Sequence, residues 1–250
     1  NLLILHLTEY QLTRGNTHLF LYTKTDESFF FQDLGFDEVA NVAGKVSFLE
    51  NRKKGFQNYI NLLKEESNPL DTERKNRIGA IVINANPFTK GHLYLAEKAA
   101  KMCDLLHIFV VSEDCSIVPF PVRWELVKMG TSHLKNVIYH KSGPYMISQQ
   151  TFPSYFLKEP KAVCEAHARL DIAIFERIAQ RLQITDRFVG EEPNSTVTAL
   201  YNHVMVESMK GGPVKITVIP RIQVKNRTVS ASIVREYIRD GKLCEVKDFV

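Results

Sequence analysis

The chain has 250 residues, of which 44% are hydrophobic and 24% charged, a composition typical of a globular protein with a substantial core. Its 32 basic and 28 acidic residues leave a formal net charge of +4, too small an excess to indicate nucleic-acid binding. No apolar run approaches the ~20 residues of a membrane span, and no basic region precedes the apolar start. The sequence therefore predicts no membrane segment.

The four cysteines are scattered without CxxC spacing, which argues against a structural zinc site or a disulfide framework. A reducing cytoplasm is the expected location. The chain begins without methionine, so we expect a fragment that lacks its native start; whether its end is also cut is left open.

Residues 1–70 are expected to form a small α+β unit and a linker. Helix is predicted over 1–13 and 27–34, with strand over 18–23 and from Phe36 onward. The stretch 29–36 resembles the F-x-x-LGF ending of the GNAT acetyltransferase fold, although a helix ending at a C-cap glycine explains it equally well. No glycine-rich loop of that family for acetyl-CoA is present in 1–65. We therefore expect part of a GNAT-like fold without acetyl transfer, and a domain boundary near residue 70.

From residue 71 to 250, strands and helices are predicted to alternate, which favours an α/β, Rossmann-like domain with a parallel sheet. The predicted strands cover 78–85, 105–111, 137–140, 187–190 and 214–219. The predicted helices cover 93–102, 121–134 and 162–182, with a last helix beginning at Ser230.

Residues 78–92 organise this second domain. The apolar run 78–85 ends at Asn86-Pro87, a pair that starts a turn, and predicts a strand covered on both faces. After this turn, apolar residues recur at helical spacing, so Thr89 to His92 lie at the start of a helix. Free N–H groups and the helix dipole favour phosphate binding there. An ordinary connection capped by Thr89 explains the local pattern as well. Thr89-Lys90-Gly91-His92 resembles the (H/T)xGH signature of the nucleotidyltransferase superfamily, whose members transfer an adenylyl or cytidylyl group.

A second motif lies near the C-terminus, from Val229 to Arg235, and resembles the ISSTxxR signature of the same superfamily. Ser230 is the predicted N-cap, and Ser232 and Arg235 are three apart, on one face. A hydroxyl and a guanidinium at one helix start can hold the β- and γ-phosphates of a triphosphate. A capped amphipathic helix with a solvated arginine would explain this motif alone; two motifs in the expected order favour a nucleotide site.

Other candidates carry weaker signals. Arg123 falls in the first turn of the predicted helix 121–134, where the superfamily often has a basic residue, so it is a phosphate candidate. Residues 190–194 follow a predicted strand, and ligands bind beyond the carboxyl ends of parallel strands. We expect them beside both motifs, although surface carboxylates are equally common. Residues 141–156, aromatic and rich in turn residues, predict either an ordered loop over the mouth of the sheet or a packed connection.

His167 and Asp171 lie four apart on the predicted helix 162–182 and could meet. Without an HExxH pattern, a structural pair or a substrate contact is favoured over a metal site or a catalytic dyad.

Six stretches together are similar to the [citrate (pro-3S)-lyase] ligase family. They are 86–92, 111–114, 142–145, 151–156, 190–193 and 229–235. The resemblance spans nearly the whole chain, with valine at position 229 where isoleucine is common. It implies an ATP-dependent ligase that adenylylates acetate with loss of pyrophosphate. The acetyl group would then pass to the thiol of the phosphoribosyl-dephospho-CoA arm on the acyl-carrier subunit of citrate lyase.

The same resemblance assigns roles to residues of both motifs. Catalysis is assigned to His92, Thr89 and Arg235. ATP binding is assigned to Asn86, Phe88, Gly91, Arg123, Gly190, Glu191, Ser230 and Ser232. Mg²⁺ bridging phosphate oxygens is expected, with no protein ligand assigned to it, and neither nucleic acid nor membrane is an expected partner.

Two other interpretations stay open. One is a small-molecule adenylyltransferase that acts on pantetheine phosphate or nicotinamide mononucleotide. The other is a non-catalytic docking or regulatory module. ATP turnover separates the module from the two enzymes, and the acceptor separates one enzyme from the other.

Overall fold

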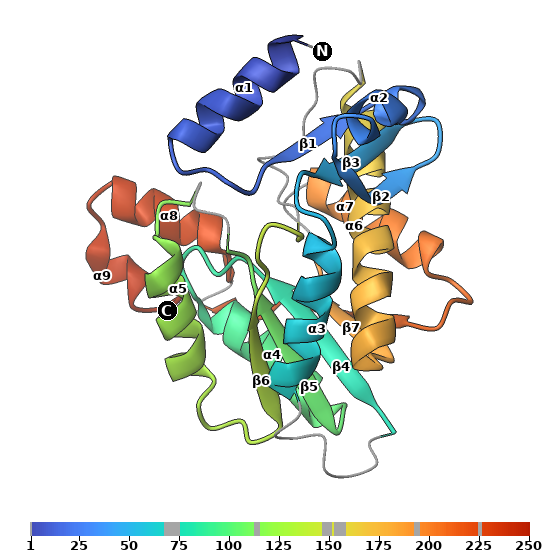
Figure 1. Ribbon diagram of the computed structural model, residues 1–250. Coiled ribbons are helices and arrows are strands. Elements are labelled where there is room, and N and C mark those ends of the chain that lie inside the picture. Colours follow the sequence, from blue (N-terminus) through green and yellow to red (C-terminus); the bar gives the residue numbers. More distant parts are fainter. Residues whose placement is uncertain are drawn as a thin grey trace.

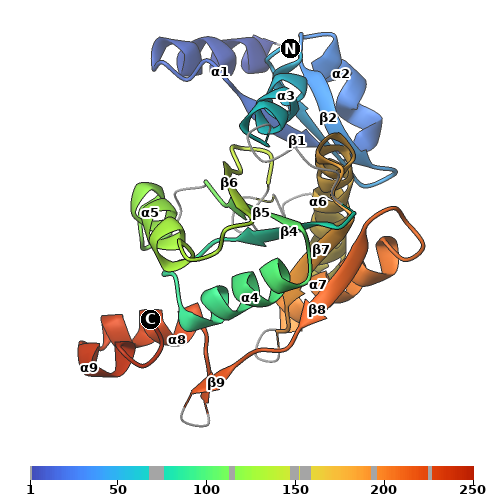
Figure 2. The same ribbon diagram turned by 90° about the horizontal axis from the view of Figure 1, so that it is seen from below.

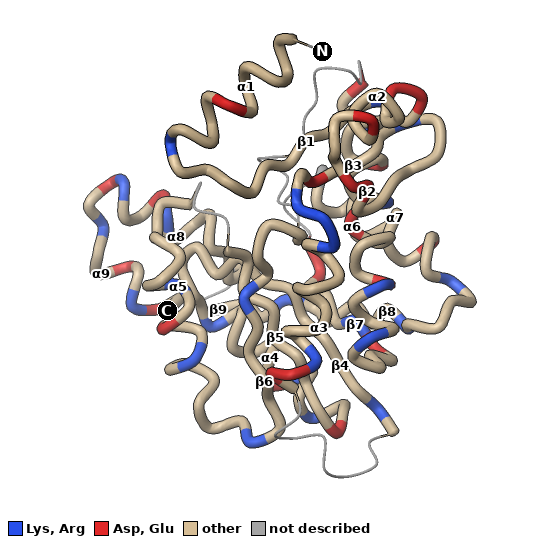
Figure 3. The backbone as a smooth tube through the Cα atoms, in the orientation of Figure 1, with Lys and Arg blue, Asp and Glu red and all other residues tan. Residues whose placement is uncertain are grey.

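A computed structural model describes residues 2–67, 76–112, 116–146, 152, 159–192, 196–224 and 227–250. A parallel sheet lies at the centre of the molecule, and a small antiparallel sheet sits at one end of it (Figure 1). Basic and acidic residues are interspersed over most of the molecule, apart from a basic run at residues 52–54 (Figure 3). Along the described ranges, no helix combines the length and the apolarity that crossing a membrane requires.

The N-terminal unit is α+β, as predicted. Its three strands form an antiparallel sheet in the order β1-β3-β2. Its elements are α1 (Leu2–Thr13), β1 (Phe20–Thr23), the 3₁₀ turn η1 (Thr25–Glu27), α2 (Ser28–Gln32), β2 (Asp37–Val42), β3 (Val46–Glu50) and α3 (Gly55–Ser67). Helix α3 was not predicted, and its last turn occupies residues assigned to the linker. Its apolar residues Phe56, Ile60 and Leu63 recur at helical spacing and are buried.

The central sheet confirms the predicted parallel α/β architecture. Its strands are β4 (Ile78–Ile83), β5 (Leu105–Val110), β6 (Val137–Lys141), β7 (Asp186–Gly190) and β8 (Lys215–Ile219). They are parallel and run in the order β6-β5-β4-β7-β8. Because the chain returns from β6 at one edge to β7 beside β4, the carboxyl ends of β4 and β7 flank the topological switch point, where open α/β sheets bind ligands.

Helices cover both faces of this sheet (Figure 2): α4 (Lys90–Lys101) and α5 (Phe120–Gly130) on one, and α3, α6 (Pro160–Leu182) and α7 (Thr196–Ser208) on the other. Helices α8 (Ala231–Arg239) and α9 (Leu243–Val246) pack on each other beside the sheet. Alternate residues of β5 enter opposite cores: Leu106 and Ile108 pack on the α4 side, whereas Phe109 joins the core that includes residues of α3 and α6. Helix α7, α9 and the short hairpin of β9 (Gln223–Val224) and β10 (Arg227–Thr228) had no predicted counterpart.

The two predicted domains share one hydrophobic core. Val46 and Phe48 of the small sheet lie in the same buried cluster as Phe109 of β5 and Leu170 of α6. The predicted boundary near residue 70 falls in 68–75, outside the described residues, and stays a prediction. Whatever its position, the N-terminal unit packs on one face of the parallel sheet instead of standing apart from it.

A buried carboxylate adds polar contacts to this junction. Glu50, 2% exposed at the end of β3, accepts hydrogen bonds from the Tyr145 hydroxyl (2.7 Å) and from the Phe56 amide (2.6 Å). His18 Nε2 lies 2.7 Å from the same carboxylate. Tyr145 belongs to the predicted loop 141–156, of which 147–151 and 153–158 lie outside the described residues; Tyr145, Met146 and Phe152 are buried.

Candidate active site

The predicted start of α4 is confirmed, and Thr89 is its N-cap in extended conformation. The Thr89 amide donates to His92 Nδ1 (3.1 Å), and the Thr89 hydroxyl lies 2.9 Å from the same nitrogen. Because Nδ1 accepts from a backbone N–H, the ring proton of a neutral imidazole sits on Nε2. His92 lines the cavity, so Nε2–H is available as a donor to a bound anion.

The charge state of His92 is set by its surroundings. Burial, followed by the positive charge of Arg221, lowers the pKa of His92 from its ordinary value to about 4. The imidazole of the free protein is therefore neutral at neutral pH. A neutral ring with its proton on Nε2 can donate a hydrogen bond to phosphate.

The last motif also folds as predicted. Ser230 is the N-cap of α8, and its hydroxyl accepts from the Ser232 amide (3.2 Å). Arg235 Nη2 donates to the Ser232 hydroxyl (3.0 Å), and Arg235 Nη1 donates to the Asn86 carbonyl (2.6 Å). Arg235 thus connects the last motif to the turn that precedes the first one.

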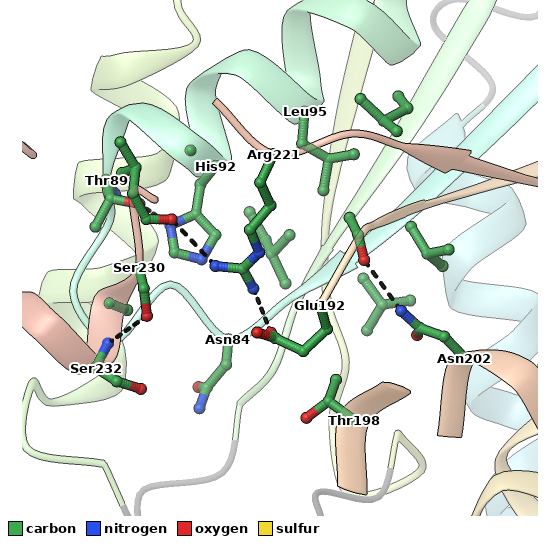
Figure 4. Close-up of a pocket in the computed structure, with 18 of the residues that line it drawn as sticks. Asn84, Thr89, His92, Leu95, Glu192, Thr198, Asn202, Arg221, Ser230 and Ser232 are labelled. Carbon is green, nitrogen blue, oxygen red and sulfur yellow. Dashed lines mark hydrogen bonds and ion pairs between the residues drawn. The ribbon is translucent and has the colours of Figure 1, made fainter. Parts of the chain in front are cut away.

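Arg221 connects three segments that are remote in sequence. Its Nε donates to the Glu191 carbonyl (2.6 Å), its Nη1 donates to the Val229 carbonyl (3.1 Å), and its Nη2 pairs with the Glu192 carboxylate. The guanidinium lies between His92 and Glu192 in Figure 4. Arg221 therefore holds the end of β7 against the start of the last motif while adding positive charge beside His92.

The C-terminal segment closes the start of α4. The Phe249 carbonyl accepts from the Lys90 amide (2.8 Å). The Lys90 ammonium donates to the carbonyls of Lys247 (3.2 Å) and Asp248 (2.8 Å). At Gly91, an added Cβ would meet the Val229 carbonyl at 3.4 Å, so glycine eases the close approach of α4 to the last motif.

Arg123 lies near the start of α5, as predicted, but it does not line the cavity. It is fully buried (0% exposed), and Nη1 donates to the backbone oxygen and to Oδ1 of Asn84 (both 2.8 Å) and to the Val111 carbonyl (2.7 Å). Its Nε donates to the Val118 carbonyl (2.9 Å). A guanidinium used in this way fixes the loops at the ends of β4 and β5 and does not reach a phosphate. Asn84, which it orients, lines the cavity, and its side chain extends into the site in Figure 4.

Three further predicted residues lie beside the cavity without lining it. Phe88 packs its ring against His92 (5.8 Å between centroids) and against Gly130, where a Cβ would collide with it. Asn86 is buried and accepts from the Val118 amide through Oδ1 (3.0 Å). Glu191 is exposed, and its backbone is used by β8 and Arg221. These residues shape the site through packing and backbone contacts.

One cavity of about 910 Å³ joins the two motifs. Thr89, Gly91, His92, Gly190, Ser230, Ser232 and Arg235 line it, as does Asn84. The expectation that the end of β7 lies beside both motifs is therefore confirmed for Gly190 and Glu192, while 193–195 fall outside the described residues. The cavity thus brings together the N-terminus of α4, a neutral imidazole, an amide, hydroxyls and a guanidinium. These hydrogen-bond donors suit a polyphosphate.

Comparison with known proteins decides the family. Residues 78–250 match the model of the citrate lyase ligase C-terminal domain. The chain belongs to the citrate lyase ligase family. The [citrate [pro-3S]-lyase] ligase of Escherichia coli K12 is 37% identical over 95% of this chain and 68% of its own length. That of Haemophilus influenzae is 38% identical over 99% of this chain and 74% of its own length.

Solved structures superimpose less closely. Pantothenate synthetase from Thermus thermophilus gives a TM-score of 0.47 at 15% sequence identity, over 70% of this chain and 65% of its own. So loose a match says nothing about the site. The family membership rests on the sequence relatives.

Several cavity residues escaped the sequence analysis, among them Asn84, Arg187, Tyr201 and Arg221. Asn84 and Arg221 follow the ends of β4 and β8, so the strand-end rule applied to residues 190–194 would have found them. Arg187 lies inside a strand and Tyr201 on an unpredicted helix, and neither carries a local signal.

Proposed function

We propose that this chain is an ATP-dependent ligase that acetylates citrate lyase through an acetyl-adenylate. The observation that carries the proposal is the single cavity in which the helix start of the first motif faces Ser232 and Arg235 of the last. The named relatives are [citrate [pro-3S]-lyase] ligases, and their activity is the one this site would perform.

In the first step, an acetate oxygen attacks the α-phosphorus of ATP. A new O–P bond forms as the bond from the α-phosphorus to the pyrophosphate oxygen breaks, so the products are acetyl-adenylate and pyrophosphate. Negative charge builds on the α-phosphoryl oxygens, where Nε2–H of His92 and the start of α4 would stabilise it. Ser232 and Arg235 would hold the departing pyrophosphate.

In the second step, the thiol of the phosphoribosyl-dephospho-CoA arm attacks the acetyl carbon. A C–S bond forms, the C–O bond to AMP breaks, and the thiol proton leaves to solvent. No enzyme nucleophile is needed. The partner would be the acyl-carrier subunit of citrate lyase, and the reaction would take place in the cytoplasm, where ATP is available.

Mg²⁺ is expected to enter as part of the MgATP substrate. Within the described ranges, no three histidine, cysteine, aspartate or glutamate side chains gather as they would around a metal ion. Mg²⁺ in nucleotide sites usually keeps several waters and binds substrate phosphates, so we expect phosphate oxygens and water to hold most of its coordination. The cavity residues would then bind the phosphates and not the ion itself.

The experiment is pyrophosphate release from MgATP, with and without acetate and the deacetylated carrier subunit. Release that requires acetate and speeds up with the carrier is expected. Phosphopantetheine serves as the competing acceptor: release driven by phosphopantetheine alone would instead indicate a small-molecule adenylyltransferase. No release from a folded chain would leave a binding module.

His92→Ala tests the chemistry within this assay. Removing one transition-state donor costs on the order of 10²-fold in rate, so we expect acetate-dependent release to fall by about 10² at saturating ATP. Leu95→Ala is the control, because Leu95 lines the cavity from the next turn of α4 with an apolar side chain. Near-native turnover in folded His92→Ala would remove the role assigned to His92.

A further inference from the structure

A further buried arginine lines the cavity from β7, a strand that carries neither motif. Arg187 lies on β7, is 4% exposed and lines the cavity. Its Nη2 donates to Asp171 Oδ2 of α6 (3.0 Å). Its Nε and Nη1 are buried and have no hydrogen-bond partner among the described residues.

The surroundings hold this guanidinium in place and keep it charged. Its Cζ lies 4.3 Å from the centroid of the Phe175 ring. The Tyr201 hydroxyl donates to the same Asp171 oxygen (2.6 Å). Burial, the largest single influence, lowers the pKa of Arg187, but Asp171 and Tyr201 together outweigh it and the pKa is raised. Arg187 is thus a fixed cation on the cavity wall, with two N–H-bearing nitrogens that the described residues leave unused.

The walls around this end of the cavity are apolar. Val82, Val189, Met146 and Met205 line the same cavity. The ring of His167 packs on Tyr201 (5.4 Å between centroids). Apolar walls around one buried guanidinium suit a small ligand with a short hydrocarbon part and a single anionic group. A polyphosphate would find its donors at the other end, with Ser232 and Arg235.

Buried N–H groups without an acceptor destabilise the free protein, so a ligand that supplies acceptors is favoured on binding. A carboxylate is the strongest common acceptor for guanidinium N–H groups. Asp171 already accepts from Nη2 and from Tyr201, which fixes the guanidinium and leaves Nε and Nη1 without an acceptor among the described residues.

We propose that Arg187 binds the carboxylate of the acid substrate, acetate, beside the nucleotide. This assignment rests on the function proposed above and supplies its second substrate site. One carboxylate oxygen accepts from Arg187, the methyl group lies against the apolar walls, and the other oxygen is left to attack the α-phosphorus. Arg187, Asp171 and Tyr201 then set the affinity for acetate, whereas the two motifs set the affinity for ATP.

Arg187→Met tests this in the pyrophosphate assay with MgATP, acetate and carrier. A hydrogen bond to a charged group contributes about 1.5–3 kcal/mol, and tenfold corresponds to about 1.4 kcal/mol. We therefore expect the KM for acetate to rise by about 10- to 100-fold, with the KM values for ATP and carrier within about twofold of native. Arg187→Lys keeps the charge next to Asp171 and should give an intermediate KM for acetate, which keeps the test open if the methionine variant does not fold.

Arg77→Met is the matched control. Arg77, just before β4, forms another arginine–aspartate pair, with Asp186 (2.7 Å) at the start of β7, and neither residue lines the cavity. The Arg77→Met variant should keep the native KM for acetate. If the KM for acetate rose equally in Arg77→Met and Arg187→Met, the rise would reflect a disturbed fold and overturn the proposal.

The remaining outcomes separate the two proposals. Acetate-independent release by the native chain would defeat the proposed function and this site together. If the native chain releases pyrophosphate only with acetate, but Arg187→Lys and Arg187→Met keep its KM for acetate, only the proposed acetate site is refuted. A rise in the carrier KM alone would assign Arg187 to the thiol arm and overturn the acetate site.

Discussion

His92 has its tautomer set before any substrate arrives. The Thr89 amide occupies Nδ1 (3.1 Å), and the low pKa keeps the ring neutral. A neutral donor stabilises charge as it develops in the transition state without a strong attraction for ATP in the ground state. In the proposed reaction, the first turn of α4 would therefore favour the phosphate in the transition state over the phosphate of bound ATP.

The titration of His92 gives a prediction with a definite sign. The folded pKa is about 4, whereas an unfolded histidine titrates near ~6.5. Above pH ~6.5 this group leaves stability unaffected; as pH falls from ~6.5 towards 4, only the unfolded chain takes up the proton, so the fold loses stability. NMR titration of the free protein, with the ring signals assigned through His92→Gln, should show a midpoint near 4. A midpoint near ~6.5 would contradict the neutral-donor role.

Arg235 contacts two segments of the site, and its substitution should affect both. It contacts the Ser232 hydroxyl and the Asn86 carbonyl, so Arg235→Ala removes a phosphate contact and loosens the turn before α4. We expect the KM for ATP to rise about tenfold or more, as for the loss of a charge-assisted hydrogen bond. Arg239→Ala, on the exposed last turn of the same helix, should leave that KM unchanged. An unchanged ATP affinity in Arg235→Ala would make Arg235 a structural residue only.

At the scale of elements, Arg123 shows how α5 supports the site. From within α5 it hydrogen-bonds the ends of β4 and β5, at Asn84 and Val111. Arg123→Met would leave several buried carbonyls without donors. We expect the free energy of unfolding to fall by about 2–4 kcal/mol, read from urea denaturation, because each buried unsatisfied group costs about 1–3 kcal/mol.

Lys128→Met is the control for Arg123. Lys128 lies in the last turn of the same helix with its side chain 44% exposed, and surface changes of this kind stay within about 0.5 kcal/mol. If Arg123→Met matched Lys128→Met in stability, the bracing of the strand ends would not depend on the guanidinium. The KM for ATP should also rise in Arg123→Met, since Asn84 loses its orientation.

At the scale of the molecule, Glu50 joins the small sheet to the loop beside the cavity. It accepts from Tyr145 (2.7 Å), and the next residue, Met146, lines the cavity. Glu50→Gln should lower the free energy of unfolding by about 1–3 kcal/mol, because the bonds to Tyr145 and to the Phe56 amide lose their charge assistance. Thermal unfolding followed by calorimetry measures this.

Glu27→Gln, exposed in the same N-terminal unit, is the control for Glu50. Since both units share one core, Glu50→Gln should still unfold in a single transition at a lower temperature. Two separate transitions in the native chain would show that the units are energetically independent.

Prediction from sequence succeeded where a local pattern has one structural solution. The buried run of β4 and the caps at Thr89 and Ser230 are such patterns, and all are found as expected. The burial of Arg123 could not be predicted, because a first-turn arginine looks the same in sequence whether it faces solvent or the core. Arg187 could not be found at all, since its partner Asp171 and its apolar surroundings are brought to it by α6 and α7 only in the folded chain.

The carbonyls of residues 247–249 complete the first turn of α4, and the Lys90 ammonium reaches across 158 residues to Asp248. A helix whose opening turn depends on so distant a segment cannot be finished while the chain is still being made. On the ribosome, β4 and α4 emerge before residues 247–249, so the first turn of α4 is completed only when that later segment has been released. The proposed catalytic turn is thus synthesised before the segment that completes it.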